Sequence, residues 1–375
     1  MPPVMPPDTA TYAIGDVDSF GLSLEEVCSF YQKHWKRPIA LALPQFYQWQ
    51  FRQSPDNQGK DRCVVIVDED RRLYGVMGLN ERRFFLDRRG LRGAELTTWI
   101  ISESCRGTGQ SLAMLEYLQD HYEVLIGMGV TQEALAAYLR CGFKQIRYIP
   151  RYVRLFHQAE NIRSIIRVEP FGLSLMRRNT AQANGSYLVR SIPIADLANH
   201  EPILRQYFHT FSREAAYLKW RYAEHPVYRY EAFQIESARH AMAVVLRVDE
   251  KETLKILHVV DTFGDLQALA AVVHFLEDYS HQHSVDLADV YALSDTLGHV
   301  FWTMGWHSVL NDEWIQVPHL FHPIELKSPP TTSLIAWAKQ GMDQLFDQTR
   351  LHITKGDCDL DRPTLQYLQE QAISL

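Results

Sequence analysis

The sequence predicts an α/β protein of the mixed α+β kind, built from two similar units in tandem, each a mostly antiparallel mixed sheet flanked by helices. The chain has 375 residues, more than one hydrophobic core usually serves. In each half, strand-like runs rich in Val, Ile, Thr and aromatic residues precede apolar residues at helical spacing. A short string also recurs at an offset of 171 residues: Trp49 and Pro55 stand six apart, as do Trp220 and Pro226.

The first unit begins with three strand-like segments in close succession, which predict an antiparallel meander; they span residues 62–70, 72–86 and 93–102. After Gly109, leucines recur at helical spacing until His121, so a helix is predicted there. A strand at residues 124–128 and a helix at residues 131–140 follow, and Gly142 supplies the stop of that helix. A further strand is expected after Pro150, where the chain crosses into the second unit.

The second unit repeats this order; its strands are predicted at residues 230–235, 240–249, 253–261 and 289–293, and its helices at 265–279 and 296–306. Because the order and the Trp string both recur, we infer a tandem duplication. Beyond it, residues 333–346 carry apolar side chains at spacing that predicts an amphipathic helix docked on the body. A membrane or partner surface is the alternative role for that helix.

These patterns divide the chain into four parts: a flexible tail at residues 1–20, the first unit at 21–165, the second unit at 166–325 and a C-terminal helical extension at 326–375.

No signal peptide and no apolar stretch near the ~18 residues of a membrane helix is seen. The five cysteines are scattered and form no C-x-x-C pair, which argues against disulfides and zinc. We predict a cytoplasmic protein without metal, and a net charge of -7 disfavours nucleic-acid binding.

The most specific motif is S-E-S-C-R-G-T-G-Q-S-L at residues 102–112, where the third strand runs into the first helix. Gly107 and Gly109 let the backbone turn tightly, and the N–H groups at the helix start point outward. Arg106 adds a charged contact, so the turn is suited to cradle phosphate. A strand-GxG-helix string is weak by itself, and an ordinary turn with a helix cap is the alternative.

The string resembles the pyrophosphate-binding motif of GNAT acyltransferases, the acyl-CoA-dependent N-acyltransferase superfamily, which is written Q/R-x-x-G-x-G/A. Arg106 and Gly109 match, and Ser111 stands where Gly or Ala is usual. A second family motif, N-x-x-A-x-x-L-Y-x-x-x-G-F, is similar to residues 131–143; the matching positions are Ala134, Tyr138, Gly142 and Phe143, while Thr131 replaces Asn and Ala137 replaces Leu. The family also has the order of elements predicted above.

The resemblance covers residues 45–150 and implies acyl transfer, by expectation of acetyl, from acyl-CoA to a primary amine. The thioester is expected where the strand at 93–102 diverges from that at 124–128, with pantetheine paired to the strand edge and a backbone N–H stabilising the oxyanion. The cofactor-binding residues so implied are Ile100, Ile101, Arg106, Gly107, Thr108, Gly109, Gln110, Ser111, Thr131, Ala134 and Tyr138.

Tyr138 is also implied as the acid that protonates the leaving thiolate, with an ordinary half-buried tyrosine as the alternative. Ala134 and Tyr138 share one helix face, and we expect Leu135 and Leu139 to face the core. No residue of the family is fixed as the base that accepts the amine proton. We assign Glu103 to that role ahead of Glu95; each is otherwise a solvated strand-end carboxylate.

The second unit lacks both motifs. Asp261 and Asp265 stand where phosphate would sit, and Phe301 and Ser294 occupy the positions of Tyr138 and Thr131. We therefore expect it to bind no acyl-CoA and to form one wall of the acceptor cleft.

The acceptor is predicted to be a small-molecule amine. The tandem arrangement resembles that of bacterial acyltransferases associated with surface-polysaccharide building, which suggests a nucleotide- or lipid-linked amino sugar. Three arginines could grip its phosphate or be plain surface charge: Arg147, Arg151 and Arg154. The loop with Asp357, Asp359 and Asp361 does not fit calcium but could meet a cationic acceptor.

Two other functions are open on the sequence. One is a Fem-like aminoacyl transferase that uses charged tRNA. The other is a protein that binds acyl-CoA without turnover. The histidines His274, His281 and His283 lack the spacing of a metal site and are read as a solvated helix end.

Overall fold

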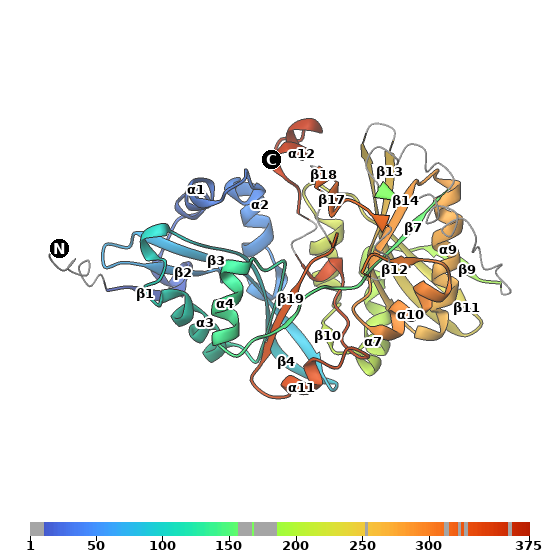
Figure 1. The fold of residues 1–375 in the computed structure, drawn as a ribbon, viewed down its shortest axis with the longest axis horizontal. Coiled ribbons are helices and arrows are strands. Elements are labelled where there is room, and N and C mark those ends of the chain that lie inside the picture. The colour runs from blue at the N-terminus through green and yellow to red at the C-terminus, as the bar shows by residue number, and fades with distance from the viewer. Residues whose placement is uncertain are drawn as a thin grey trace.

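Two large mixed sheets lie side by side along the molecule and are flanked by helices (Figure 1). This computed structural model describes residues 11–156, 167–168, 186–251, 254–310, 315–321, 324–325, 329–358 and 362–375. The architecture agrees with the predicted fold class.

The first sheet has the order β1-β2-β3-β4-β5-β19-β6, and β10 pairs with β3. Its strands are β1 (Ala13–Asp16), β2 (Val64–Val67), β3 (Leu73–Leu86), β4 (Arg89–Ile101), β5 (Val124–Met128), β6 (Lys144–Ile146), β10 (Thr210–Phe211) and β19 (Leu334–Ala338). Strands β2, β3 and β4 form the predicted antiparallel meander, and β5 lies parallel to β4.

The second sheet has the order β9-β11-β12-β13-β14-β7-β15. Its strands are β7 (Arg151–Leu155), β9 (Leu188–Ser191), β11 (Glu231–Ser237), β12 (His240–Lys251), β13 (Leu254–Gly264), β14 (Leu287–Tyr291) and β15 (His307–Ser308). Here too an antiparallel meander is followed by a parallel strand, because β14 runs parallel to β13. Two short ladders stand apart; they pair β8 (Arg167–Val168) with β16 (Ile315–Gln316), and β17 (Leu320–Phe321) with β18 (Ile324–Glu325).

Helices cover both sheets, and within the described part of the chain none is long and apolar enough to cross a membrane. The first unit has α1 (Leu24–His34), α2 (Pro44–Tyr47), α3 (Gln110–His121) and α4 (Gln132–Arg140). The second has α7 (Glu201–Tyr207), α8 (Ala215–Leu218), α9 (Leu269–Gln282) and α10 (Asp295–Thr303), and α11 (Met342–Leu345) and α12 (Leu365–Glu370) follow. One hydrophobic core joins α3 and α4 to the first sheet, and a larger core extends through both units.

The two units exchange a strand. β7 comes at the end of the first unit in sequence but lies in the second sheet between β14 and β15, whereas β19 follows the second unit and lies in the first sheet between β5 and β6. Each strand occupies the place that corresponds to the other. The chain therefore crosses between the sheets twice, which ties the two units together.

The amphipathic helix predicted at residues 333–346 is wrong for most of its length. Leu334, Ile335 and Ala336 are fully buried in β19, and only Met342–Leu345 forms a short helix. A strand covered on both faces reads as a continuous apolar run, and periodicity cannot separate such a run from a buried helix.

The recurring Trp strings adopt the same local structure. α2 continues into the π-helical turn η3 (Gln48–Arg52), and α8 continues into the π-helical turn η7 (Lys219–Ala223). α8 begins 171 residues after α2, and η7 begins 171 residues after η3, which is the offset between the two strings themselves. The repeat in sequence is thus a repeat in structure at this position.

Candidate functional site

The glycine-rich loop predicted to cradle phosphate links the short 3-10 helix η5 (Glu103–Cys105) to α3. Gly107 and Gly109 have φ angles of 78° and 90°, which L-residues rarely adopt. A Cβ on either residue would meet no atom within 4 Å. Glycine is needed here for the backbone conformation, while the space above the loop stays open to a ligand.

The amides at the middle of this loop have no acceptor among the described residues. The N–H of Arg106 donates to the carbonyl oxygen of Glu103 at 3.2 Å, and the amides of Leu112 and Ala113 donate to that of Gly109. Between them, the amides of residues 107–111 donate to no protein group that the structure describes. A helix of 12 residues starts at Gln110, so its positive dipole end adds to these donors. The arrangement suits an anion.

Strands β4 and β5 diverge next to this loop. Their parallel pairing runs from Gly93 with Val124 to Leu96 with Gly127 and ends there among the described residues, while β4 stays paired with β3 as far as Ile101. The predicted contact residues Ile100 and Ile101 therefore lie on a stretch of β4 whose β5 side carries no strand. An extended ligand can pair with such an edge.

A β-bulge marks the point of divergence. β4 has two residues, Thr98 and Trp99, opposite Met77 of β3, and Thr98 adopts a φ of 45°. The hydroxyl of Tyr31 donates to the carbonyl oxygen of Thr98 at 3.1 Å, and Arg362 donates to its side-chain oxygen at 2.8 Å. Both contacts hold the bulge in place.

Tyr138 lies beside this bulge, in the core between α4 and the sheet. Its ring packs edge-on against Trp99 at 5.1 Å and against Phe143 at 5.0 Å, and the residue is 4% exposed. Burial raises the pKa of the phenol well above its ordinary value, which keeps it protonated at neutral pH. The indole nitrogen of Trp99 is also buried, without a hydrogen-bond partner among the described residues.

The faces of α4 differ from the prediction. Tyr138 faces the core; of the two leucines expected there, Leu135 packs against the core partly buried, whereas Leu139 is 50% exposed. The ring of Phe143, which follows the Gly142 stop, and that of Trp99 offer the tyrosine an aromatic site that a leucine fills less well. Thr131 is exposed and acts as the N-cap, because its hydroxyl accepts from the amide of Ala134 at 3.3 Å.

The two candidate bases occupy different surroundings. Glu103 is exposed in η5, while Glu95 is 6% exposed at the middle of β4. The side-chain amide of Asn80 donates to Glu95 at 3.4 Å. Glu95 lines a pocket between the two units.

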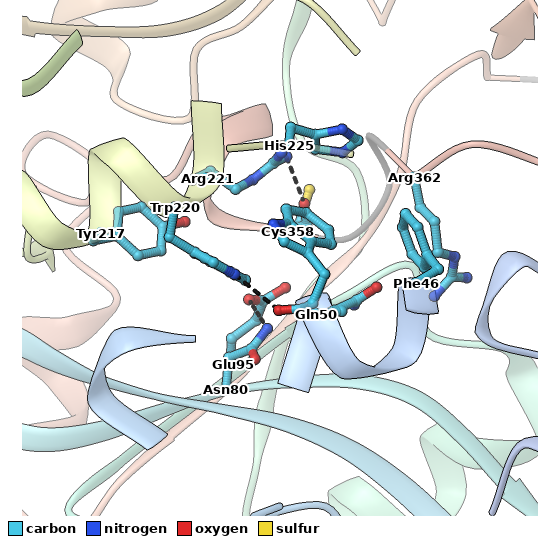
Figure 2. Close-up of a pocket in the computed structure, with 11 residues that line it drawn as sticks. Phe46, Gln50, Asn80, Glu95, Tyr217, Trp220, Arg221, His225, Cys358 and Arg362 are labelled. Carbon is cyan, nitrogen blue, oxygen red and sulfur yellow. Dashed lines mark hydrogen bonds between the residues drawn. The ribbon is translucent and has the colours of Figure 1, made fainter. Parts of the chain in front are cut away.

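That pocket lies between the two units and encloses about 320 Å³, part of it open to solvent (Figure 2). Sequence reasoning missed it, because its walls come from segments far apart in the chain. They are Phe46, Trp49 and Gln50 from α2 and η3, Asn80 and Glu95 from the sheet, Tyr217, Trp220, Arg221 and His225 from the second unit, and Cys358 and Arg362 from the C-terminal segment. The repeated Trp strings were the one signal that pointed to it.

In the second unit the corresponding place is filled by the chain itself. β13 and β14 stop pairing after Val259 and Val290, and the 3-10 helix η9 (Lys355–Asp357) packs there. Lys355 donates to Asp289 at 2.6 Å, and a Cβ on Gly356 would lie 3.0 Å from Asp261.

The residues that mark the degenerate motif in this unit are also engaged. Asp261 is buried and pairs with Arg213 at 2.7 Å, whereas Asp265 caps η8 (Leu266–Ala268) and accepts from His240. Phe301 is fully buried against Trp306, and the hydroxyl of Ser294 donates to the carbonyl oxygen of Thr349.

Several residues predicted to meet the acceptor are engaged elsewhere. Arg151 is buried against Asp289 at 2.7 Å, and Arg154 against Glu277 at 2.9 Å, so neither is a surface charge nor a phosphate clamp. Asp357 is buried between arginines. Asp359 and Asp361 lie outside the described residues, and Arg147 is exposed beside Tyr148. Within the described chain, no group of His, Cys, Asp and Glu side chains is arranged to hold a metal ion.

No family model and no curated protein sequence matches the chain, but solved structures do. A GCN5-related N-acetyltransferase from Anabaena variabilis is 9% identical with a TM-score of 0.54, over 87% of this chain and 72% of that one. One from Kribbella flavida is 12% identical with a TM-score of 0.51, over 88% and 71%. A protein from Enterococcus faecalis, described as a "probable N-acyltransferase", is 12% identical with a TM-score of 0.54, over 90% and 75%. These likenesses establish the fold as GNAT-like.

Proposed function

We propose that the protein is a GNAT-type N-acyltransferase that moves a short acyl group, acetyl by preference, from acyl-CoA to a primary amine. The observation that carries this proposal is the divergence of β4 and β5 beside a loop whose amides, at residues 107–111, have no acceptor among the described residues. The open edge of β4 suits the pantetheine arm of acyl-CoA, and the loop amides suit the pyrophosphate of the same ligand.

The residues present fit acyl-CoA. Gly107 and Gly109 leave open space where the diphosphate would lie, and Arg106 adds a positive charge at the loop. The buried indole nitrogen of Trp99, which has no described partner, is a donor that a bound ligand would satisfy. Thr131 and Ala134 at the start of α4 would bound the other side of the arm. Acyl-CoA supplies the activated thioester, and the protein supplies the groups that act on it.

In the proposed reaction the amine nitrogen forms a bond to the thioester carbonyl carbon and the carbon–sulfur bond breaks. Two side chains and one backbone N–H assist this step. Tyr138, kept protonated by burial, donates its proton to the sulfur as the thioester bond breaks. A backbone N–H at the Thr98 bulge stabilises the negative charge that develops on the acyl oxygen. Glu95 replaces Glu103 as our assignment for the base that accepts the amine proton, because it is the carboxylate that faces the pocket.

The acyl group is proposed to be short because the space behind the bulge is filled. A Cβ on Gly78 would lie 2.6 Å from the ring of Phe51 and 2.9 Å from the methyl of Thr97, so the space beside Gly78 is already filled by these side chains. For the acceptor we retain an amino sugar and a role in surface-polysaccharide building, on the resemblance of the tandem arrangement.

The proposal is tested with the purified full chain. Calorimetric titration with acetyl-, butyryl- and palmitoyl-CoA measures binding, and release of free thiol in the presence of an amine panel measures transfer. We expect acetyl-CoA to bind and to release thiol only when an amine is present. Absence of binding to all three thioesters would refute the proposal, and binding without amine-dependent release would reduce the protein to an acyl-CoA binder.

A further inference from the structure

We propose that Tyr31 is a positioning residue for acyl transfer, because its hydroxyl holds the peptide between Thr98 and Trp99 so that the N–H of Trp99 faces the acyl oxygen. This inference rests on the proposed function, since it names the backbone donor of that reaction and the side chain that orients it. Tyr31 lies on α1, outside both of the sequence motifs.

The backbone of β4 at the bulge is turned away from β3. The carbonyl oxygen of Arg92 accepts from the residue that precedes β5, and because backbone groups alternate along an antiparallel ladder, the carbonyl of Thr98 is also directed away from β3. The bulge displaces this alternation by one residue. Beyond it, the N–H of Ser102 donates back to β3 at 2.8 Å, so the backbone of Trp99, three residues earlier, is turned away as well. Thr98 and Trp99 thus both present backbone groups to the side that β5 has left.

A single peptide unit cannot direct both of its groups to one side. In a trans peptide the carbonyl and the N–H point in opposite directions, so the unit that joins Thr98 to Trp99 stands across the sheet and not in its plane. The φ of 45° at Thr98 occurs at this point. A β-branched residue rarely adopts such a conformation, and surrounding contacts must therefore hold this peptide in place.

Tyr31 supplies such a contact from one face of the first sheet. Its hydroxyl donates to the carbonyl oxygen of Thr98 at 3.1 Å. The side chain is fully buried, in the same core as Val76 of β3. The rings of Trp35 and Tyr47 flank it, with centroids 6.5 Å and 6.3 Å away. A hydroxyl on a ring packed in this way has little freedom to move, so it fixes the direction of the carbonyl that it binds.

The N–H of Trp99 then points toward the opposite face. The side chain of Trp99 packs against the core that holds Tyr138, on the side of α3 and α4, whereas Tyr31 belongs to the core on the side of α1. Because the carbonyl of the shared peptide points toward Tyr31, its N–H points away from α1. The acyl oxygen would meet this N–H on the side where the sulfur of the same thioester is proposed to meet Tyr138.

Fixing the direction of this donor matters for the rate more than for binding. A backbone donor stabilises an oxyanion best when it is oriented before the reaction, and loss of one such donor costs about 10²–10³ in kcat. Removing the hydroxyl of Tyr31 keeps the N–H of Trp99 but lets the peptide turn, so the expected loss is smaller, about tenfold. CoA affinity, which we assign mainly to the loop at residues 107–111, should not change.

Tyr31→Phe tests the inference, since it removes the hydroxyl and keeps the buried ring. In the full chain we expect kcat for amine-dependent thiol release from acetyl-CoA to fall about tenfold, while the affinity for CoA, measured by calorimetry, stays within about twofold. The matched control is Tyr47→Phe, at a tyrosine that is equally buried and whose hydroxyl makes no hydrogen bond to the described part of β4. This control should keep kcat within about twofold of the wild type.

A spectroscopic readout separates positioning from a loss of stability and needs no acceptor. Acetyl-CoA labelled with carbon-13 at the thioester carbonyl is bound to the full chain, and its carbonyl stretch is measured by infrared difference spectroscopy. A hydrogen bond to this oxygen polarises the carbonyl and lowers the frequency. We expect a lowered frequency in the wild type and in Tyr47→Phe, and a return toward the frequency of free acetyl-CoA in Tyr31→Phe. A residue that only supported the fold would leave the frequency of the bound thioester where it was.

An unchanged carbonyl frequency in Tyr31→Phe would overturn the inference, whatever the change in kcat, and would leave the proposed function intact. Equal effects of Tyr31→Phe and Tyr47→Phe would also overturn it, because they would report a general loss of packing. So would a wild-type frequency equal to that of free acetyl-CoA, since no donor would then face the oxygen. Failure of the wild-type chain to bind acetyl-CoA is a different result, which removes the proposed function and this inference with it.

Discussion

Trp49 and Trp220, the same position in the two repeated strings, stack on each other across the boundary between the units, with ring planes 23° apart. The indole nitrogen of Trp220 donates to the carbonyl oxygen of Trp49 at 2.9 Å. The repeat thus builds its own interface: each copy of the string supplies one face of the contact, and the pocket opens beside it.

Removing one ring from this stack should destabilise the whole chain. Trp220→Ala deletes a side chain that is 4% exposed, and we expect it to lower the free energy of unfolding by about 3 kcal/mol, as large-to-small changes in cores do. Trp302→Ala is the control, because Trp302 is 58% exposed and should change stability by no more than about 0.5 kcal/mol. Urea unfolding followed by tryptophan fluorescence compares them. Equal losses in both would contradict the interface assignment.

Gly109→Val should abolish tight CoA binding. The added side chain finds free space, although a φ of 90° strains any L-residue, and it projects into the space in which the diphosphate is proposed to lie, so we expect affinity to fall by at least about tenfold. Gly59→Val is the matched control, since Gly59 also has a positive φ, of 76°, and no atom within 4 Å of a Cβ. Calorimetry with acetyl-CoA gives the comparison. If Gly59→Val loses as much affinity for acetyl-CoA as Gly109→Val, backbone strain and not ligand contact causes the loss. If neither variant loses affinity, the loop is not the diphosphate site.

Tyr138→Phe should lower kcat about a hundredfold and leave CoA affinity unchanged, because it removes a proton donor and keeps the ring that packs against Trp99 and Phe143. Burial raises the pKa of this phenol, so no loss of activity from its ionisation is expected below about pH 10, the ordinary phenol value. Tyr148→Phe, a change at an exposed tyrosine, is the control. An undiminished kcat in Tyr138→Phe would assign the proton to another donor.

Much of this site follows from local sequence. The strand order, the turn at Gly107 and Gly109 and the helix after it depend on neighbouring residues, and the structure has them where they were predicted. The strand exchange cannot be predicted from local sequence. The apolar run of β19 is equally compatible with a helix, and the strands that β19 pairs with, β5 and β6, lie some 200 residues earlier in the chain.

Long-range partners explain the other errors. Arg151 looked like a surface charge because Asp289, the carboxylate that neutralises it, stands 138 positions away. The pocket was missed for the same reason, since Glu95 and Arg362 line one pocket only after the distant segments of the chain have folded together. Burial decides which charges are structural and which are available, and single-sequence patterns do not report burial.

The choice between the two carboxylates can be made by isosteric substitution. Glu95→Gln keeps an acceptor for Asn80 but cannot take a proton, so kcat at neutral pH should fall about a hundredfold. The deficit should shrink as the pH rises toward the pKa of the amine, because the acceptor then arrives already neutral. Glu103→Gln should have a much smaller effect, and Glu116→Gln, at an exposed helix position, serves as the control. A larger loss in Glu103→Gln would restore that residue as the base.

The buried carboxylate of Asp357 should make the free energy of unfolding decrease as the pH falls. Burial opposes its ionisation, yet Arg213, at 2.6 Å, and Arg82, at 3.0 Å, lower its pKa to about 2. A carboxylate with a depressed pKa stabilises the fold above its unfolded pKa of about 4, and that stability is lost as the pH falls toward 2.

Asp357→Asn should therefore cost about 3 kcal/mol at neutral pH, since it takes this carboxylate away from the buried Arg82 and leaves Arg213 with Asp261 as its remaining carboxylate partner among the described residues. The gap between wild type and variant should narrow below about pH 4, where the unfolded wild-type chain takes up the proton. Urea unfolding from pH 7 to pH 3 measures it, with Asp70→Asn, at a side chain 71% exposed, as the control. A gap that stays constant over this range would show that the ion pairs do not set the acid sensitivity of the fold, and that the loss in Asp357→Asn comes from the geometry of η9 alone.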